Sequence, residues 1–368
     1  MTTGDALADI AAQIESPDRQ IAQSAADRWD SLTKPQGALG RLEALGTWWA
    51  SVSGQCPPAP PARPTLVIIA GDHGVARTAR TSAYPPEVTA QMVRTFLSER
   101  AAANALARSV GARVRVVDLG VDADPAYADD LAPDVTRYRV RRASGSIDRE
   151  DAMTGAEAQQ AFDAGVAIAD DEIDAGADLI IIGDMGIGNT TSASAIVGLL
   201  GPADAIAVVG RGTGIDDETW MRKCAAVRDA MRRGKALKAS PLELLATIGG
   251  PDIAAMVGML LRCAQRRTPV ILDGTVSTAA ALIAHRAAYR ARDWWQAGHR
   301  STEPAHTTAL GRLDLTPLLE LDMRLGEGTG ALLAIPLIAA SAAALGEMLT
   351  FEEAGVATSG DQIADNPT

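Results

Sequence analysis

One acidic residue, Glu327, stands between two glycines in the segment RLGEGTGALL, residues 324–333. A carboxylate in a partly dry site has a raised pKa, which brings it toward the value that a general base needs near neutral pH. The glycines would let a ligand approach the backbone closely. Arg324 could pair with a phosphate or carboxylate, and Thr329 could cap a following helix. Glu327 is therefore a candidate base; the alternative is that it only interacts favourably with a helix amino terminus.

A second glycine-rich segment, GDMGIGNTTSAS at residues 183–194, begins where a predicted strand ends and continues into a predicted helix. Asn189, Thr190 and Thr191 can cap that helix and present free N–H groups to an anion. The segment lacks the lysine of a Walker loop and the third glycine of a dinucleotide fingerprint. It predicts phosphate binding, with an ordinary strand-to-helix turn as the alternative.

The segment AGDHG, residues 70–74, offers Asp72 and His73 at another predicted strand end. A metal is conceivable there. With only four histidines in the chain, however, no second or third ligand has suitable spacing. Hydrogen bonding within the floor of the site is the favoured interpretation.

Three further groups have weaker signals. His299 stands beside Ser301 in GHRS, which could hold a phosphate or a carboxylate or form a surface loop. Lys223 ends IDDETWMRK, whose acids suit a helix start; by itself that segment is typical of a solvated helix. His285 and His306 are expected to be structural. The three cysteines have no neighbouring histidine and are expected to pack in the core.

These groups need a scaffold, and the chain predicts an open α/β sheet. Short, almost continuously apolar runs predict strands buried on both faces, at 65–72, 112–120, 177–184, 205–210 and 268–274. Alanine-rich segments predict the crossover helices, at 91–109, 155–174, 190–200, 216–233, 251–266 and 277–290. Several strands end in a polar, glycine-bearing cluster, and in such sheets the ligand crevice lies beyond the carboxyl ends of the strands.

Both chain ends are predicted to be helical and to pack together as a smaller domain. Residues 5–54 carry helical periodicity broken at SLTKPQGALGRLE, and a long apolar helix lies near the carboxyl end. Residues 329–349 could span a membrane by length. Because the segment contains Pro336, is dominated by alanine and has no basic flank, a buried core helix is favoured.

Composition excludes some classes of partner. The 368 residues carry a formal charge of -12, and their basic residues form no stripe, which disfavours nucleic acid. The amino terminus has neither the basic start nor the apolar centre of a secretory signal. Three cysteines without paired spacing suggest a reducing cytoplasm.

Nine segments, spread in order over nearly the whole chain, resemble the nicotinate-nucleotide:dimethylbenzimidazole phosphoribosyltransferase family. They are LTKPQGALGRLE, AGDHGV, YPPEVTAQMV, GDMGIGNTT, GTGIDD, GGPDIAAM, LDG, GHRSTEP and RLGEGTGA. The combination of RLGEGTGA, GDMGIGNTT and GHRS is the specific part of the resemblance.

The resemblance implies a reaction. The phosphoribosyl group of nicotinate mononucleotide passes to 5,6-dimethylbenzimidazole, giving α-ribazole 5′-phosphate and nicotinate for the lower ligand of cobalamin, with inversion at C1′. The residue matching Glu327 removes the benzimidazole N–H proton. The resemblance implies no metal or redox cofactor, a Rossmann-like open parallel sheet with helices on both faces, and a homodimer with sites near its interface.

The family's binding residues carry over only where this sequence matches. The mononucleotide site corresponds to Gly186, Gly188, Asn189, Thr190, Thr191, Lys223, Ser301, Arg324, Gly326, Gly328 and Thr329. The aromatic acceptor is assigned to the region of Asp72, His73, Tyr84, Met92 and Met185.

Two departures from the family bear on function. Some members have Ser and Gln where this chain has Tyr84 and Met92, so acceptor preference could differ. Many members have glutamate where this chain has Asp184, whose shorter side chain puts a secondary catalytic or orienting role in doubt. The rival hypotheses are the same donor chemistry with another acceptor, such as adenine or a phenol, and a catalytically silent nucleotide-binding regulator.

The expected domain organisation follows the chain. It comprises a helical segment of the small domain at 1–60, a Rossmann-like catalytic domain at 61–310, a catalytic loop with helices completing the small domain at 311–355, and a loose tail at 356–368.

Overall fold

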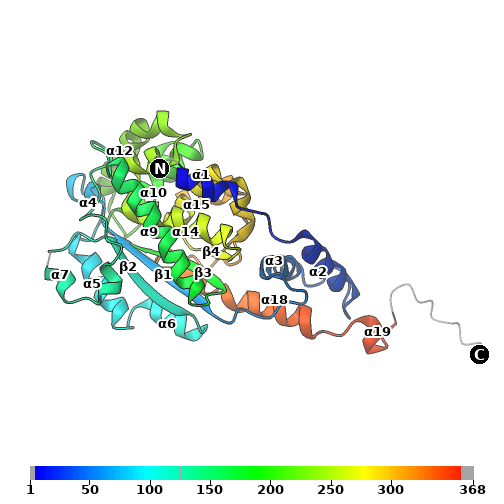
Figure 1. Cartoon of the computed structure of the whole chain (residues 1–368). Coiled ribbons are helices and arrows are strands. Elements are labelled where there is room, and N and C mark those ends of the chain that lie inside the picture. The colour runs from blue at the N-terminus through cyan, green and yellow to red at the C-terminus, as the bar shows by residue number, and fades with distance from the viewer. Residues whose placement is uncertain (1–4, 125, 358–368) are drawn as a thin grey trace, which may run out of the picture. The chain divides into compact units, whose positions relative to one another are not determined.

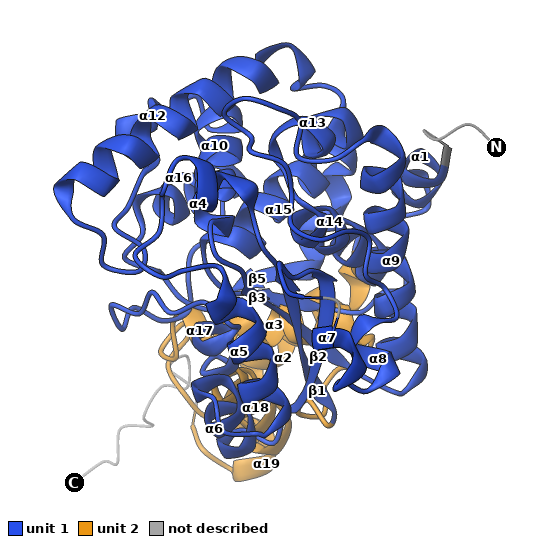
Figure 2. Cartoon of the chain, turned by 90° about the vertical axis from the view of Figure 1, so that its left-hand side faces the viewer, with its two compact units in different colours: residues 1–16, 63–334 blue, residues 17–62, 335–368 orange. Residues whose placement is uncertain are grey.

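The computed structural model describes residues 5–124 and 126–357 of the chain (Figure 1). Within them the chain forms two compact units, coloured separately in Figure 2. The larger runs through Ser16 and from Arg63 to Ala334, and the smaller contains Pro17–Ala62 and the chain from Ile335. Residues 5–16 and 311–334 thus group with the sheet, whereas the sequence placed them with the small helical domain. The expected tail lies outside the described residues from 358 onward.

The larger unit is built on a five-stranded parallel sheet in the order β2-β1-β3-β4-β5. The strands are β1 (Pro64–Gly71), β2 (Arg113–Gly120), β3 (Leu179–Met185), β4 (Val270–Leu272) and β5 (Trp295–Ala297). Every residue of β1 and β4 is buried, as expected for strands covered on both faces. The predicted Rossmann-like α/β class is confirmed.

Helices cover both faces of this sheet (Figure 2). On one face α14 contacts β1 and β2, α15 contacts β3, and α9 packs on α14; on the other face α5, α6 and α17 contact the strands. The helices before β4 are α1 (Asp5–Ala12), α4 (Gly74–Thr78), α5 (Glu87–Leu97), α6 (Ala102–Ser109), α7 (Ala126–Asp129), α8 (Pro133–Thr136), α9 (Gly155–Asp174), α10 (Asn189–Leu200), α11 (Ala205–Val208), α12 (Asp217–Gly234), the 3₁₀ turn η1 (Lys235–Leu237), α13 (Pro241–Ile248) and α14 (Pro251–Gln265). After β4 come α15 (Thr275–Ala287), the 3₁₀ helix η2 (Tyr289–Trp294), α16 (Pro304–Leu313) and α17 (Thr329–Leu332).

One predicted strand of this sheet was wrong, and one strand was not predicted. Residues 205–210 are not a strand, because Ala205–Val208 forms the helical turn α11, which packs among α10, α12 and α16. A short apolar run cannot be assigned to strand or helix by periodicity alone. The fifth strand is instead β5, whose three residues, WQA, are too short to give a pattern.

The expected helix at 91–109 is two helices, α5 and α6, separated at residues 98–101. Asn104 holds this break, because its side-chain oxygen accepts from the Ala101 N–H at 3.2 Å and its amide donates to the Phe96 carbonyl at 3.1 Å. Glu99, with φ of 60°, turns the chain between them. The break leaves α5 as a separate helix with its own buried face of Thr89, Ala90, Val93 and Phe96.

The smaller unit is helical, as predicted for a domain made from two distant parts of the chain. It contains α2 (Arg19–Ser31), α3 (Arg41–Ser53), α18 (Ile335–Glu347) and α19 (Phe351–Ala354). Its core includes Trp29, Leu32 and Leu345. Arg28 donates to the Leu345 carbonyl at 2.7 Å, where a cation favours a helix carboxyl end.

Among the described residues, Thr329–Glu347 is the one segment long and apolar enough to cross a membrane by length and composition. In the structure it comprises α17 and α18 with a turn between them, and 56% of its apolar window is buried inside the protein. Mostly buried core helices pass the same test. The burial agrees with the core-helix interpretation.

Candidate active site

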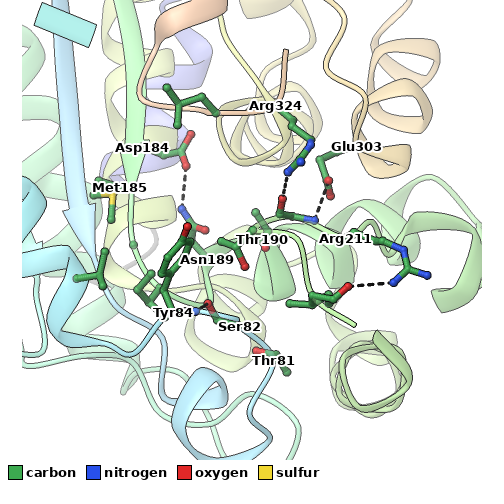
Figure 3. A pocket seen from close by; sticks show the side chains of 18 of the residues that line it. Thr81, Ser82, Tyr84, Asp184, Met185, Asn189, Thr190, Arg211, Glu303 and Arg324 are labelled. Carbon is green, nitrogen blue, oxygen red and sulfur yellow. Dashed lines mark hydrogen bonds between the residues drawn. The ribbon is translucent and has the colours of Figure 1, made fainter. Parts of the chain in front are cut away.

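A cleft of about 800 Å³ opens in the larger unit beyond the carboxyl end of β3 (Figure 3). This is the point where the strand order reverses between β1 and β3, which is where open α/β sheets bind ligands. Residues from four regions form its wall: Thr81, Ser82, Tyr84, Val88 and Met92; Asp184 to Thr190; Arg211, Gly212, Thr213, Ile215 and Lys223; and Glu303, Arg324, Leu325 and Glu327.

Glu327 reaches this wall from an unusual backbone turn. Gly326, Glu327 and Gly328 all have positive φ, at 82°, 60° and 79°. Glycine adopts this region freely, but a residue with a side chain does so rarely, and such strained residues cluster at functional sites and in tight turns. The Glu327 N–H donates to the Asp184 carbonyl at 3.2 Å, which holds the turn against the end of β3. The glycines flanking Glu327 are therefore needed for the turn itself.

The carboxylate of Glu327 is poised to exchange a proton. Its side chain is buried, and Oε2 has no hydrogen-bond partner among the described residues. Burial, and then the charge of Asp273, raise its pKa to about 7. A carboxylate with such a pKa is partly ionised at neutral pH and binds a proton well, which are the properties of a general base.

Asp184, at the end of β3, faces the same cleft (Figure 3). Its Oδ2 accepts from the Asn189 side-chain amide at 2.8 Å. Burial and the nearby charges of Asp273, Asp252 and Glu327 raise its pKa to about 8, against the effect of the Asn189 hydrogen bond. Asp184 is therefore largely protonated at neutral pH.

One side of the cleft carries cations. The Lys223 ammonium is buried and donates to the Thr190 hydroxyl at 2.8 Å. Burial lowers the pKa of Lys223, although the charge of Glu303 opposes this. Arg324 donates to the Gly212 carbonyl, and the Gly212 N–H donates to Glu303 at 2.9 Å (Figure 3). This side of the cleft suits an anion such as a phosphate.

The opposite part of the wall is apolar. Tyr84, Val88, Met92, Met185 and Leu325 contribute to it, and the side chains of Tyr84 and Leu325 are 54% and 55% exposed. Large apolar groups left exposed at the edge of a cleft often mark a ligand site. A flat aromatic molecule is the kind of ligand that such a wall accommodates.

The structure brings most of the predicted site residues together, but not all. Gly186, Gly188, Asn189, Thr190, Lys223, Arg324, Tyr84, Met92, Met185, Asp184 and Glu327 line the cleft. Gly326, Gly328 and Thr329 build the turn around Glu327, with the Thr329 hydroxyl donating to the Gly326 carbonyl at 2.7 Å.

Besides Gly326, Gly328 and Thr329, four further predicted residues are not part of the cleft wall. Thr191 is buried, with its hydroxyl donating to Thr81 at 3.1 Å, and Ser301 is buried, with its N–H donating to His306 at 2.9 Å. His73 pairs with Asp252 at 3.0 Å in the interior. Asp72 is also buried; it accepts from the Ile187 N–H at 2.9 Å, the Asp122 N–H at 2.7 Å and the Thr89 hydroxyl.

Sequence reasoning missed several wall residues. They are Thr81, Ser82, Val88, Ile187, Arg211, Gly212, Thr213, Ile215, Glu303 and Leu325. Glu303 lies in the GHRSTEP segment and Gly212 in GTGIDD. Both segments belong to the family resemblance, but neither residue was given a role in binding. In residues 5–124 and 126–357, no group of three His, Cys, Asp or Glu side chains is placed to hold a metal ion.

The chain is similar to known proteins over most of its length. A family model described as phosphoribosyltransferase matches residues 14–356. A nicotinate-nucleotide–dimethylbenzimidazole phosphoribosyltransferase from Mycolicibacterium paratuberculosis is 56% identical over 345 residues, covering 94% of this chain and 97% of that protein. One of the same name from Mycobacterium tuberculosis is 54% identical, covering 94% of both chains. The crystal structure of CobT from Thermus thermophilus superposes with a TM-score of 0.86 at 42% identity, covering 92% of this chain and 99% of that one.

Proposed function

This chain belongs to the nicotinate-nucleotide–dimethylbenzimidazole phosphoribosyltransferase family, and from that premise we infer the reaction in its cleft. The protein transfers the phosphoribosyl group of nicotinate mononucleotide to 5,6-dimethylbenzimidazole, forming α-ribazole 5′-phosphate and nicotinate for cobalamin. The observation that supports this reaction most directly is the buried Glu327 carboxylate, with an unpaired oxygen on the wall of the cleft.

In this reaction Glu327 takes the N–H proton of the benzimidazole. The lone pair of the other ring nitrogen forms the new bond to C1′, and the electrons of the old C1′–N bond return to the nicotinate ring nitrogen, which loses its positive charge. Attack from the face opposite the leaving nicotinate converts the β anomer into the α anomer. A positioned base of this kind accelerates reactions by roughly 10²- to 10⁴-fold.

The mononucleotide phosphate binds on the cationic side of the cleft. Lys223 and the Thr190 hydroxyl are already joined there, and the amino end of α10 begins at Asn189. A helix amino terminus attracts an anion through its free N–H groups and its dipole. Arg324, exposed at the rim, adds a guanidinium that can pair with two oxygens.

Asp184 plays a different part from Glu327. Its pKa, raised to about 8, lies above that of Glu327, so Asp184 is the less suitable base of the two and could instead offer its proton to a substrate. Its remaining oxygen is held by Asn189. The short side chain of Asp184 thus suits an orienting role better than a catalytic one.

The apolar wall receives the acceptor. Tyr84 and Met92 offer faces on which a planar base can lie, with Val88 between them on the first turns of α5. The same surface would also accept a purine or a phenol, so those acceptors are the alternative. We keep two assignments from the family as proposals: a homodimer, and a cytoplasmic location, which three free cysteines support.

The test is to incubate the purified protein with nicotinate mononucleotide and each of a panel of acceptors, and to identify products by mass. We expect nicotinate and α-ribazole 5′-phosphate with dimethylbenzimidazole. Faster nicotinate release with adenine or a phenol would support the alternative acceptor. An absence of nicotinate release with every acceptor would reject transferase activity and favour a nucleotide-binding regulator.

A further inference from the structure

Asp273, directly after β4, holds the loop that carries Glu327. Its carboxylate is fully buried and accepts three backbone hydrogen bonds, from Gly328 at 3.1 Å, Gly330 at 2.9 Å and Ala331 at 3.0 Å. These three donors follow Glu327 and enter the first turn of α17. A single side chain from another strand thus satisfies the N–H groups that a helix start leaves free.

The pocket around Asp273 is arranged to keep its carboxylate charged. His299 Nε2 lies 3.4 Å from Oδ1. Burial alone would raise the pKa of Asp273, but the adjacent His299 and the hydrogen bond from the Ala331 N–H, with His306, together lower it. Gly330 permits this packing, because a Cβ there would lie 2.1 Å from the His299 ring. The negative charge therefore persists at neutral pH.

That charge acts on Glu327. The charged and titratable groups around the base are Asp184 from β3, Asp273 after β4, His299 after β5 and Arg324 on its own loop. The ring of His306 of α16 is tilted against that of His299, with their centroids 5.8 Å apart. Of these, Asp273 contributes the charge that raises the pKa of Glu327, after burial itself. Asp273 does not line the cleft, so it acts without touching substrate.

We propose that Asp273 is a positioning residue for the transfer reaction: its carboxylate holds the backbone of the Glu327 loop and places a fixed negative charge beside that base. The proposal rests on the proposed function, in which Glu327 is the base. A purely structural helix cap would need the three hydrogen bonds but would leave the titration of Glu327 unchanged. The pH dependence of turnover separates these two roles.

The experiment is Asp273→Asn in the full chain, with kcat and kcat/KM measured from pH 5.5 to 9 using nicotinate mononucleotide and dimethylbenzimidazole. Asparagine keeps the size and one accepting oxygen but removes the charge. We expect kcat to fall by about 10²-fold, the size of effect that misplacing a reacting group can produce. Loss of a nearby negative charge lowers the pKa of Glu327, so the acidic limb of the profile should move by roughly half a unit or more toward lower pH.

An acidic limb that stays in place, whatever the loss of rate, would overturn the proposal and leave Asp273 as a structural cap. An unchanged kcat would overturn it as well. Wild-type protein assayed in parallel separates these results from a failure of the proposed function, which would appear as no nicotinate release before any substitution.

A milder variant keeps the proposal testable if Asp273→Asn does not fold. The Ser277 hydroxyl accepts from the Asp273 N–H at 3.1 Å, so Ser277→Ala loosens the aspartate without removing it. We expect a several-fold lower kcat with an unchanged KM for nicotinate mononucleotide. Thr278→Val is the matched control, since that hydroxyl bonds only to the Gly274 carbonyl, at 2.7 Å. Equal kcat values for the two variants would contradict the positioning role.

Discussion

Two buried aspartates stand at corresponding places on either side of β3, yet their surroundings give them different properties. Asp72 follows β1 and Asp273 follows β4, and each accepts three hydrogen bonds. The donors to Asp273 all belong to one loop. The donors to Asp72 come from three segments: Thr89 on α5, Ile187 after β3 and Asp122 after β2.

The pKa values of the two carboxylates are also shifted in opposite directions. Burial raises the pKa of Asp72 to about 6, although its hydrogen bonds and His73 oppose the shift. Burial is the largest single influence on the pKa of Asp273 and would raise it, but His299, the Ala331 N–H and His306 together lower it. Asp72 therefore mainly joins α5 to the loops after β2 and β3, whereas Asp273 adds a charge that raises the pKa of Glu327. Position at a strand end thus does not decide what a carboxylate does; the partners of the carboxylate do.

The largest expected effect is on turnover, and it comes from replacing Glu327, whose loop Asp273 holds. Glu327→Gln keeps the shape and cannot take a proton, so turnover should fall by roughly 10²- to 10⁴-fold while nicotinate mononucleotide still binds. Steady-state kinetics and calorimetric titration measure the two properties. Glu320→Gln, an exposed residue paired with Arg300, is the matched control. Wild-type turnover in Glu327→Gln would mean that the proton leaves by another group.

The free energy of unfolding of Glu327→Gln should also depend on pH differently from that of the wild type. Because the pKa of Glu327 in the folded protein is raised above 4.5 to about 7, ionising it costs stability as the pH rises through that range. Glutamine avoids this cost. Glu327→Gln should therefore gain stability relative to the wild type between pH 5 and pH 8, measured by urea unfolding.

The next prediction applies to Asp72 the substitution already proposed for Asp273, aspartate to asparagine. Asp72→Asn leaves at least one of its donors unpaired in the interior, which costs about 1–3 kcal/mol. Unfolding should occur at a lower temperature, and the KM for dimethylbenzimidazole should rise because α5 carries Val88 and Met92. The acidic limb of the pH profile should stay where it is in the wild type, since Asp72 is not among the charges that shift Glu327. A limb displaced as far as in Asp273→Asn would abolish the distinction between the two residues.

This distinction explains which features could be predicted from the sequence and which could not. Continuous apolar runs and turn residues predicted β1 to β4, the helix at 155–174 and the two glycine-rich loops of the cleft, because those signals are local. The roles of Asp72 and Asp273 depend on partners such as Ile187, 115 positions from Asp72, and Ala331, 58 positions from Asp273. No spacing rule marks such pairs.

Other misses have the same origin. The Asp273 motif, LDG, was part of the family resemblance, but Asp273 does not line the cleft, so ligand chemistry gave no reason to single it out. Glu303 and Arg211 reach the cleft from irregular loops, whose paths carry no periodic signal. Thr191 and Ser301 belong to binding motifs but turn inward, because the helix or turn that contains them presents its other residues to the cleft.

The smallest expected effect tests one of the three links that Asp72 makes. Thr89→Val keeps the branched shape and removes the hydroxyl, which donates to Asp72 and also accepts from the Ile187 N–H at 3.2 Å. Because the Ile187 N–H keeps its hydrogen bond to Asp72, the net cost should be about 1 kcal/mol, the value of the hydrogen bond between Thr89 and Asp72. Thr95→Val, on the same helix, is the control, because the Thr95 hydroxyl bonds only to the Gln91 carbonyl, at 2.8 Å. Thr89→Val should lower the unfolding midpoint more than Thr95→Val and raise the KM for dimethylbenzimidazole slightly, with kcat and its pH profile unchanged. If the two variants behave alike, the tie between Asp72 and α5 is dispensable, and Asp72 holds only the loops after β2 and β3, as Asp273 holds only one.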